Sequence, residues 1–174
     1  MKPLTHYIQK KLVIKKSKYN YFPQTKEELK DIINQRIRQE GNEVDLNNID
    51  VSKITDMSSL FKDTNFNGDI SNWDVSNVKD MSVMFFNCEA FNQDISRWDV
   101  SSVKFMSNMF AGCKTFNQDI SKWNVSNVKY MNRMFYRCEA FNQDISKWDV
   151  SNVKNDISVF GRCNIEDKYK PKFK

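Results

Sequence analysis

The stretch that decides the fold is WDVSNVKDMSVMFFNCEAFNQDIS (Trp73–Ser96), because most of it recurs every 25 residues. Its last six residues, FNQDIS, occur three times without change, at Phe91–Ser96, Phe116–Ser121 and Phe141–Ser146. A fixed period of about 20 to 50 residues is typical of stacked repeats, in which one small unit is copied along an axis. We therefore interpret FNQDIS as an architectural element rather than as a site built for one partner.

Apolar residues within one copy follow a helical spacing. Val78, Met81, Met84, Phe85 and Cys88 stand at i, i+3, i+6, i+7 and i+10, which places them on one face of a helix. The spacing predicts a helix of about three turns, too short to be stable alone and therefore held by its neighbours. Met and Phe at these positions are predicted to be core residues rather than a cofactor site.

The segment after the cysteine predicts a short extended strand. Phe91 and Ile95 are four residues apart, which places both on one face of a strand. The Asn, Gln and Asp between them are expected to make the same turn in every copy. Trp98 breaks the alternation, so the strand is expected to bend or end there. One unit is thus predicted as a strand, a turn, a short helix and a return loop.

The ends of the chain are predicted to close the stack. Thr25 and Glu28 have the spacing of a capping box before an apolar stripe, which predicts a helix over Thr25–Glu40. At the other end Asp156 and Glu166 replace apolar residues, as a polar terminal cap requires. We divide the chain into a basic N-terminal segment (1–22), a capping helix (23–45), about five repeats (46–163) and a basic C-terminal tail (164–174).

The motif W-D-V-S-x-V-x-x-M-x-x-M-F-x-x-C-x-x-F-N-x-D-I, from Trp73 to Ile95, resembles the BspA-like, mycoplasma-type branch of the leucine-rich-repeat proteins. Those repeats form arrays in mollicute surface lipoproteins, other bacteria, some protists and giant DNA viruses. The resemblance covers roughly residues 25–170 and implies a viral or bacterial source, a right-handed solenoid and a binding or surface role. It implies no catalytic residue. The predicted fold is an α/β solenoid, a leucine-rich-repeat-like right-handed stack of 25-residue units with an N-terminal capping helix.

The net charge of +5 is concentrated at the ends of the chain. Residues 1–20 carry six lysines and no acidic residue, whereas residues 21–160 have a net charge of −4. A lysine-rich tail can bind nucleic acid, but we expect solvated termini and regard nucleic acid as an unlikely partner. No apolar run suits a signal peptide or a membrane span. We expect an intracellular protein, with surface attachment only if a signal was removed.

Three columns of the repeat are predicted to form structural ladders. One cysteine per repeat does not match zinc spacing and predicts buried free thiols, with disulfides between neighbouring repeats as the alternative. The aspartates are predicted to cap turns or to pair laterally with a basic column, with cation binding as the alternative. The ladder residues are Trp73, Trp98, Trp123, Trp148, Cys88, Cys113, Cys138, Cys163, Asp69, Asp94, Asp119 and Asp144; the basic column is Arg97, Lys122 and Lys147.

The sequence carries no recognisable catalytic machinery. The only histidine is His6, in the basic N-terminal segment. No phosphate-binding Gly-rich loop and no His-Glu-x-x-His pattern occurs. We therefore predict no catalytic residue, no metal site, no cofactor and no enzymatic activity.

Columns in which the copies disagree are the best candidates for function, because columns shared by all copies serve the architecture. Exposed aromatic residues in such columns suit a protein interface, although filling grooves between helices is an equal alternative. The basic column can bind an acidic partner. The partner-binding candidates are Phe86, Phe105, Tyr130, Tyr136, Arg97, Lys122 and Lys147.

The predicted function is a non-catalytic protein-interaction module. The first alternative is a structural or self-assembling protein, in which the chain forms a homo-oligomer. The second alternative is nucleic-acid binding through the lysine-rich tails, which salt-dependent binding would reveal.

Overall fold

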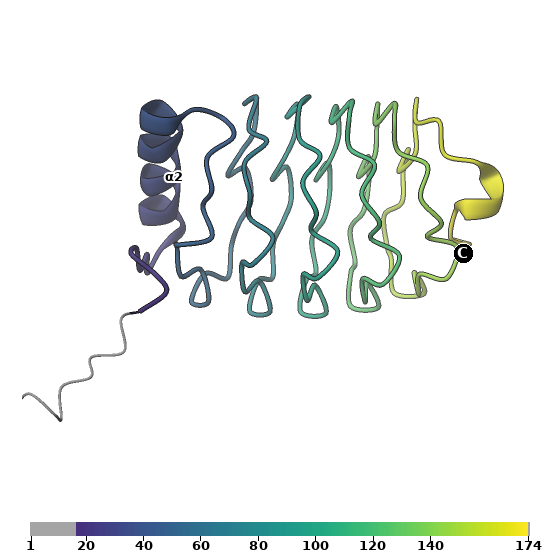
Figure 1. The fold of residues 1–174 in the computed structure, drawn as a ribbon. Coiled ribbons are helices and arrows are strands. Elements are labelled where there is room, and N and C mark those ends of the chain that lie inside the picture. Colours follow the sequence, from purple (N-terminus) through teal and green to yellow (C-terminus); the bar gives the residue numbers. More distant parts are fainter. Residues whose placement is uncertain (1–16, 174) are drawn as a thin grey trace, which may run out of the picture.

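The computed structural model describes residues 17–173, in which coils of the chain lie side by side in sequence order (Figure 1). Isolated parallel bridges join neighbouring coils along one column, here called the bridge column: Asp56, Asp80, Phe105, Tyr130 and Asn155. The first step in this column is 24 residues and the later steps are 25 residues. The repeat period read from the sequence is thus the length of one coil.

The predicted α/β solenoid of alternating strands and helices is wrong. Within residues 17–173 the only helices are α2 (Lys26–Glu40) and the short 3₁₀ helix η1 (Asp167–Tyr169). In the same range, strand pairing is limited to isolated bridges. The segments predicted as three-turn helices are successions of turns, and the segments predicted as short strands have no regular secondary structure, so the leucine-rich-repeat-like unit is absent from residues 17–173.

The backbone hydrogen bonds explain why no helix forms in the repeats. In an α-helix every amide donates four residues back along its own chain. Here alternate amides donate instead to carbonyls of the next coil, at 2.8–2.9 Å: Met81, Val83, Phe85 and Asn87. Of the amides between them, Met84 and Phe86 donate three residues back, to the Met81 and Val83 carbonyls, and Ser82 donates to the Asp80 side chain. Local turns and contacts between coils therefore share the backbone groups that a helix would use internally.

Left-handed residues interrupt every copy at two positions. Val83 has φ 63° and Asn87 has φ 54°, a conformation that ends any right-handed helix. The equivalent residues of the other coils are left-handed as well: Ser59, Asp63, Asn108, Gly112, Arg133, Arg137, Ser158 and Arg162. The apolar spacing that resembled a helical stripe therefore arises from a chain that turns inward every three or four residues.

Val83 is the β-branched residue among these left-handed positions, and a valine is strained there. We expect Val83→Asn to raise the free energy of unfolding by about 1 kcal/mol, because asparagine tolerates positive φ. Urea denaturation measures the change. The reciprocal Asn108→Val change should lower stability by a similar amount. A loss of stability in Val83→Asn would show that the valine packing outweighs the backbone strain.

Aromatic rings stacked from coil to coil form the centre of the core. Phe110 lies between Phe85 and Phe135, with ring centroids 5.5 and 5.7 Å away, and Phe116 stacks on it at 4.2 Å. All four rings are fully buried. The predicted core columns of Phe, Met, Val, Ile and Trp are buried across the central coils, which confirms that part of the sequence interpretation.

The polar residues of FNQDIS make two kinds of hydrogen bond, one between neighbouring coils and one within a coil. Asn92 Oδ1 accepts the Asn117 amide of the next coil at 3.0 Å, and the Gln118 side chain donates to the Asn92 carbonyl at 2.8 Å. Asp119 Oδ1 accepts the Ser121 amide of its own coil at 2.9 Å. The predicted turn is therefore made by the aspartate, whereas the asparagine and glutamine link coils.

Helix α2 covers the N-terminal end of the stack (Figure 1). Thr25 caps it by accepting the Glu28 amide, as the capping-box spacing predicted. Leu29 and Ile33 are fully buried against the first coil. Arg36, which is only 8% exposed, donates to Glu40, to Asn48 Oδ1 at 3.0 Å and to the Asp45 carbonyl at 3.2 Å. The helix thus closes the core at this end.

Residues 164–173, predicted as a basic tail, pack against the other end of the stack. Phe173 lies 6.5 Å from Phe160. This matches the separation of 6.3 Å between Trp148 and Phe135, which have the same 13-residue spacing. Phe173 therefore occupies the place of the tryptophan in the last coil. Most of the predicted basic N-terminal segment lies outside the described residues, as does His6.

Candidate functional site

A pocket of about 250 Å³ lies beside Ala111, where the equivalent residues of the two neighbouring coils carry aromatic side chains. One variable column reads Phe86, Ala111, Tyr136 and Gly161. The rings of Phe86 and Tyr136 line the two sides of the pocket, with the small Ala111 between them. We call this pocket the Ala111 gap. Rings of neighbouring coils stack 5.3–6.5 Å apart elsewhere in the stack, so the gap is a ladder with one ring missing.

Gly112 keeps the neighbouring wall of the gap open. It has φ 81°, and a Cβ atom there would lie 2.5 Å from Asn87 Oδ1. Asn87 in turn donates to Asp63 Oδ1 at 2.9 Å. A side chain at residue 112 would therefore displace Asn87 as well as strain the backbone.

Three arginines surround the Tyr136 ring; Arg133 and Arg137 also line the gap, whereas Arg162 lies on the next coil. The guanidinium carbons of Arg133, Arg137 and Arg162 lie 6.0, 5.7 and 5.9 Å from the centre of the Tyr136 ring, within cation–π range. Among residues 17–173 none of the three forms an ion pair with a carboxylate. The gap thus has an aromatic wall beneath positive charge that no carboxylate of residues 17–173 pairs with.

The four aromatic candidates do not form a single patch. Phe105 and Tyr130 belong to the bridge column and stack on each other at 5.3 Å with nearly parallel planes. Phe105 is 37% exposed, and Tyr130 is partly buried. No ring contact in the described residues joins this pair to Phe86 or Tyr136. The structure therefore brings Phe86 and Tyr136 to one pocket and separates them from Phe105 and Tyr130.

The basic column of Arg97, Lys122 and Lys147 is exposed and does not line the Ala111 gap. No ion pair within 4 Å joins it to the aspartate column in residues 17–173. Hydrogen bonds from Ser96 are the main reason that the pKa of Asp94 is lowered. The positive charge of Arg97 makes a smaller contribution in the same direction.

Each aspartate of the ladder instead accepts an amide two residues ahead, at 2.9–3.0 Å: Asp69, Asp94, Asp119 and Asp144. Turn capping is therefore confirmed for the aspartate column, and close lateral pairing is not found.

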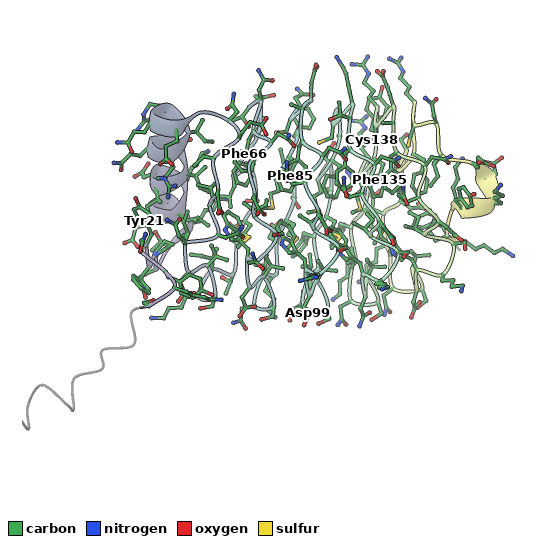
Figure 2. The ribbon with its side chains drawn as sticks, in the orientation of Figure 1. Tyr21, Phe66, Phe85, Asp99, Phe135 and Cys138 are labelled. Carbon is green, nitrogen blue, oxygen red and sulfur yellow. The ribbon has the colours of Figure 1, made fainter. Side chains whose placement is uncertain are left out.

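The tryptophan ladder ties neighbouring coils together. Each indole N–H donates to a backbone carbonyl of the preceding coil, at 3.0–3.2 Å, and each ring is at most 6% exposed. The donors are Trp73, Trp98, Trp123 and Trp148. Figure 2 shows Phe66, Phe85, Phe135 and Cys138 along the stack, while Asp99 lies at its edge. These ladders form the scaffold for the gap.

The four cysteines are free thiols, as predicted, and three of them are fully buried. Their sulfur atoms contact backbone carbonyls: Cys88 with Phe66, Cys113 with Phe85, Cys138 with Phe110 and Cys163 with Phe141. Burial raises the pKa of Cys88 to about 11 from the ordinary value of 9.0. It also raises the pKa values of Cys113 and Cys138 well above 9.0.

We expect the thiols to make stability fall at alkaline pH. A raised pKa means that the folded protein keeps its proton while the unfolded chain loses it, so the stabilisation is complete below pH 9 and declines above it. Between pH 9 and 11, Cys88 should contribute a decline of about 1.4 kcal/mol per pH unit. Urea denaturation at several pH values tests this. Cys88→Ala should flatten the decline, and an unchanged slope would contradict the assignment.

A second, more open pocket of about 460 Å³ lies at the C-terminal end of the stack. Trp148, Val150 and Pro171 line it, together with Lys168 and Lys170. These two lysines are paired, with Glu166 at 2.8 Å and Asp167 at 2.6 Å. Lys172 also lines the pocket, so two of its three lysines are paired with acidic neighbours.

Neither a metal-binding group nor a membrane-spanning helix is found among the described residues. No group of three or more His, Cys, Asp or Glu side chains gathers in a metal-binding arrangement between residues 17 and 173. No helix in that range has the length and hydrophobicity required to cross a membrane.

The arginines around Tyr136 were not among the residues predicted from the sequence. Arg137 and Arg162 share a variable column with Asp63, Asn87 and Gly112. The disagreement among these copies is the signal that would have identified the column. In the predicted helix, residues 136 and 137 would point in different directions. The observed left-handed turns instead bring Arg137 and Arg162 to the Tyr136 ring.

The profile of one protein family matches residues 28–120 and, in a second overlapping match, residues 64–170. Its description is "Mycoplasma protein of unknown function, DUF285". No curated protein matches the chain. No solved structure matches it either. Because the two matches together span most of the chain, including every coil and the Ala111 gap, the protein belongs to this mycoplasma-type family.

Proposed function

We propose that the protein is a non-catalytic interaction module that binds a segment of a partner protein in the Ala111 gap. The observation that carries this proposal is the missing ring between Phe86 and Tyr136. An aromatic side chain from a partner would complete the ladder by stacking between two rings that are already in place. The surrounding coils hold both rings, so little ordering is needed on binding.

The size of the gap favours a side chain over a free small molecule. Pockets for drug-sized ligands hold about 300–1,000 Å³, and the gap holds about 250 Å³. Its walls also come from columns in which the copies disagree, whereas the scaffold columns repeat. Both features suit a site that recognises one anchor residue of a larger partner.

The relation to the BspA-like branch is part of this proposal, and it rests on the repeated motif rather than on leucine-rich-repeat architecture. That resemblance implies a binding role. Of the alternatives, nucleic-acid binding through the C-terminal tail is disfavoured, because Lys168 and Lys170 are paired with acidic neighbours. Self-assembly stays a prediction.

Filling the gap from within the protein tests the proposal. Ala111→Tyr places an aromatic ring where the equivalent residues Phe86 and Tyr136 already carry one, so the fold should tolerate it. Ala140→Tyr is the matched control, because residue 140 is exposed and does not line the gap. Both variants should retain the thermal melting transition of the wild type.

Peptides from a random display library are selected on the immobilised wild-type protein and measured against the two variants. We expect Ala111→Tyr to weaken the selected peptides at least about tenfold, and Ala140→Tyr to leave their affinity unchanged. Peptides that bind wild type and Ala111→Tyr equally would overturn the proposal, as would a selection that yields no binder.

A further inference from the structure

We infer that the segment bound in the Ala111 gap is acidic, with carboxylates flanking an aromatic anchor. This inference rests on the proposed function and adds the chemistry of the partner. Its basis is the group of three arginines around Tyr136, here called the arginine cluster: Arg133, Arg137 and Arg162.

The arginine cluster is positioned by the backbone. All three residues are left-handed, with φ 56°, 59° and 57°. Arg133 and Arg137 lie on one coil and Arg162 on the next, so two turns of one coil and one turn of its neighbour bring the charges to the same ring. Arginine is a poor choice for a left-handed position on backbone grounds. Three arginines in left-handed positions around one ring indicate that their side chains, rather than their backbone preference, are required there.

The charge of the arginine cluster is not used within the described part of the protein. Residues 17–173 provide no carboxylate within ion-pair distance of these guanidinium groups. At the opposite wall Lys62 lies 5.8 Å from the Phe86 ring, but it is paired with Asp63 at 3.6 Å. Free positive charge is therefore concentrated on the Tyr136 side of the gap.

A carboxylate suits these donors, because a guanidinium can bind both of its oxygens at once. An anchor ring in the gap would place the neighbouring residues of the partner over the rim, where Arg133 and Arg137 lie, with Arg162 on the far side of the same Tyr136 ring. Acidic residues beside the anchor would then neutralise the arginine cluster. Complementary charge at the rim also accelerates the encounter and selects among partners.

A protein segment is favoured over nucleic acid for two reasons. The arginines gather around one ring, whereas a nucleic-acid groove needs positive charge along the path of a phosphate backbone. Residues 21–160 also carry a net charge of −4, which repels a long polyanion. A short acidic segment meets the local positive charge without spanning the acidic body.

Four synthetic peptides, acetylated and amidated at their ends, test the inference by fluorescence polarisation. They are Asp-Glu-Phe-Glu-Asp, Gln-Asn-Phe-Asn-Gln, Lys-Arg-Phe-Arg-Lys and Asp-Glu-Ala-Glu-Asp, each with a fluorophore on a glycine linker. A ten-nucleotide single-stranded DNA of mixed sequence is the polyanion control. Each probe is titrated into wild type, Ala111→Tyr and the triple variant Arg133→Gln, Arg137→Gln, Arg162→Gln.

We expect the acidic phenylalanine peptide to bind at least about tenfold more tightly than the neutral one, because charge-assisted hydrogen bonds are stronger than neutral ones. The triple glutamine variant should abolish that preference, and Ala111→Tyr should abolish binding. The acidic alanine peptide should bind more weakly than its phenylalanine counterpart. Raising the salt to about 1 M should reduce the preference, since it shortens the screening length to about 3 Å.

The outcomes separate the two proposals. Equal binding of the acidic and neutral phenylalanine peptides, both lost in Ala111→Tyr, would overturn the acidic partner and leave the gap as a binding site. Tighter binding of the DNA, lost in the triple glutamine variant, would also overturn it. If Ala111→Tyr changes the binding of no peptide, both the acidic partner and the proposed function are wrong. Single Arg→Gln variants guard against misfolding of the triple variant.

Discussion

Replacing Phe110 by alanine is expected to lower the free energy of unfolding by about 3–5 kcal/mol, the range for removing a buried aromatic side chain. Phe110 is fully buried and contacts rings on both neighbouring coils and within its own coil. Its loss would leave a cavity whose walls are the remaining rings, held in place by hydrogen bonds between coils. Because these walls cannot collapse freely, we expect a value in the upper half of the range.

Phe160→Ala is the matched control in the last complete coil. Phe160 belongs to the same column, but it stacks on one preceding phenylalanine and is only partly buried. Its replacement should cost about 1–2 kcal/mol, since less apolar surface is lost. Urea denaturation of both variants gives the comparison. Equal losses would show that a position inside the stack confers no additional stability, contrary to this account.

Replacing Trp123 by alanine is expected to cost a similar amount, about 3–5 kcal/mol. The ring is 4% exposed and stacks on Trp148 at 6.4 Å, while its indole N–H donates to the Ile95 carbonyl at 3.1 Å. Two contributions are therefore lost together, namely packing between coils and a hydrogen bond between coils to the Ile95 carbonyl.

Trp123→Phe separates the two contributions. It keeps a ring in the column but removes one of the two donors to the Ile95 carbonyl, which still accepts the Trp98 amide at 3.1 Å. The loss of this one hydrogen bond should cost about 0.5–1.5 kcal/mol. Phe173 provides a natural parallel, because it stands in the tryptophan place of the last coil. Denaturation of the two Trp123 variants measures the difference. A phenylalanine variant as stable as the wild type would mean that the indole hydrogen bond contributes nothing.

The buried columns could be predicted from the sequence, but the path of the backbone could not. Apolar side chains at three- and four-residue intervals point to one side in a helix, and they do so equally in a chain that turns inward at the same intervals. Glycine usually marks left-handed turns, yet Val83, Asn108 and Arg133 take these positions here. A glycine-based signal for turns was therefore missing from most copies.

FNQDIS illustrates both the reach and the limit of the sequence. Its phenylalanine and isoleucine were correctly predicted as core, and its aspartate as the residue that makes a turn. The asparagine was assigned to the same turn, although Asn67 accepts the Asn92 amide of the next coil. A single copy contains no information on this contact, because donor and acceptor lie 25 residues apart.

The sequence predicted the two aromatic residues of the candidate site but not its other residues. Phe86 and Tyr136 were identified because their column varies from copy to copy, and both line the Ala111 gap. Ala111 could not be predicted as part of the site, because its significance depends on the rings of Phe86 and Tyr136 being its neighbours in space. The arginine cluster needed the left-handed turns as well, which the sequence did not reveal.

The most direct test of the account is the methyl spectrum of the alanines, since the chain contains only Ala90, Ala111 and Ala140. NMR of carbon-13-labelled alanine methyl groups is recorded while the acidic phenylalanine peptide is added. We predict that the Ala111 methyl signal shifts strongly, because the ring current of the anchor enters the gap beside it, while Ala90 and Ala140 keep their positions. Binding of the peptide with no change at Ala111, or with the main change at Ala90 or Ala140, would contradict the account.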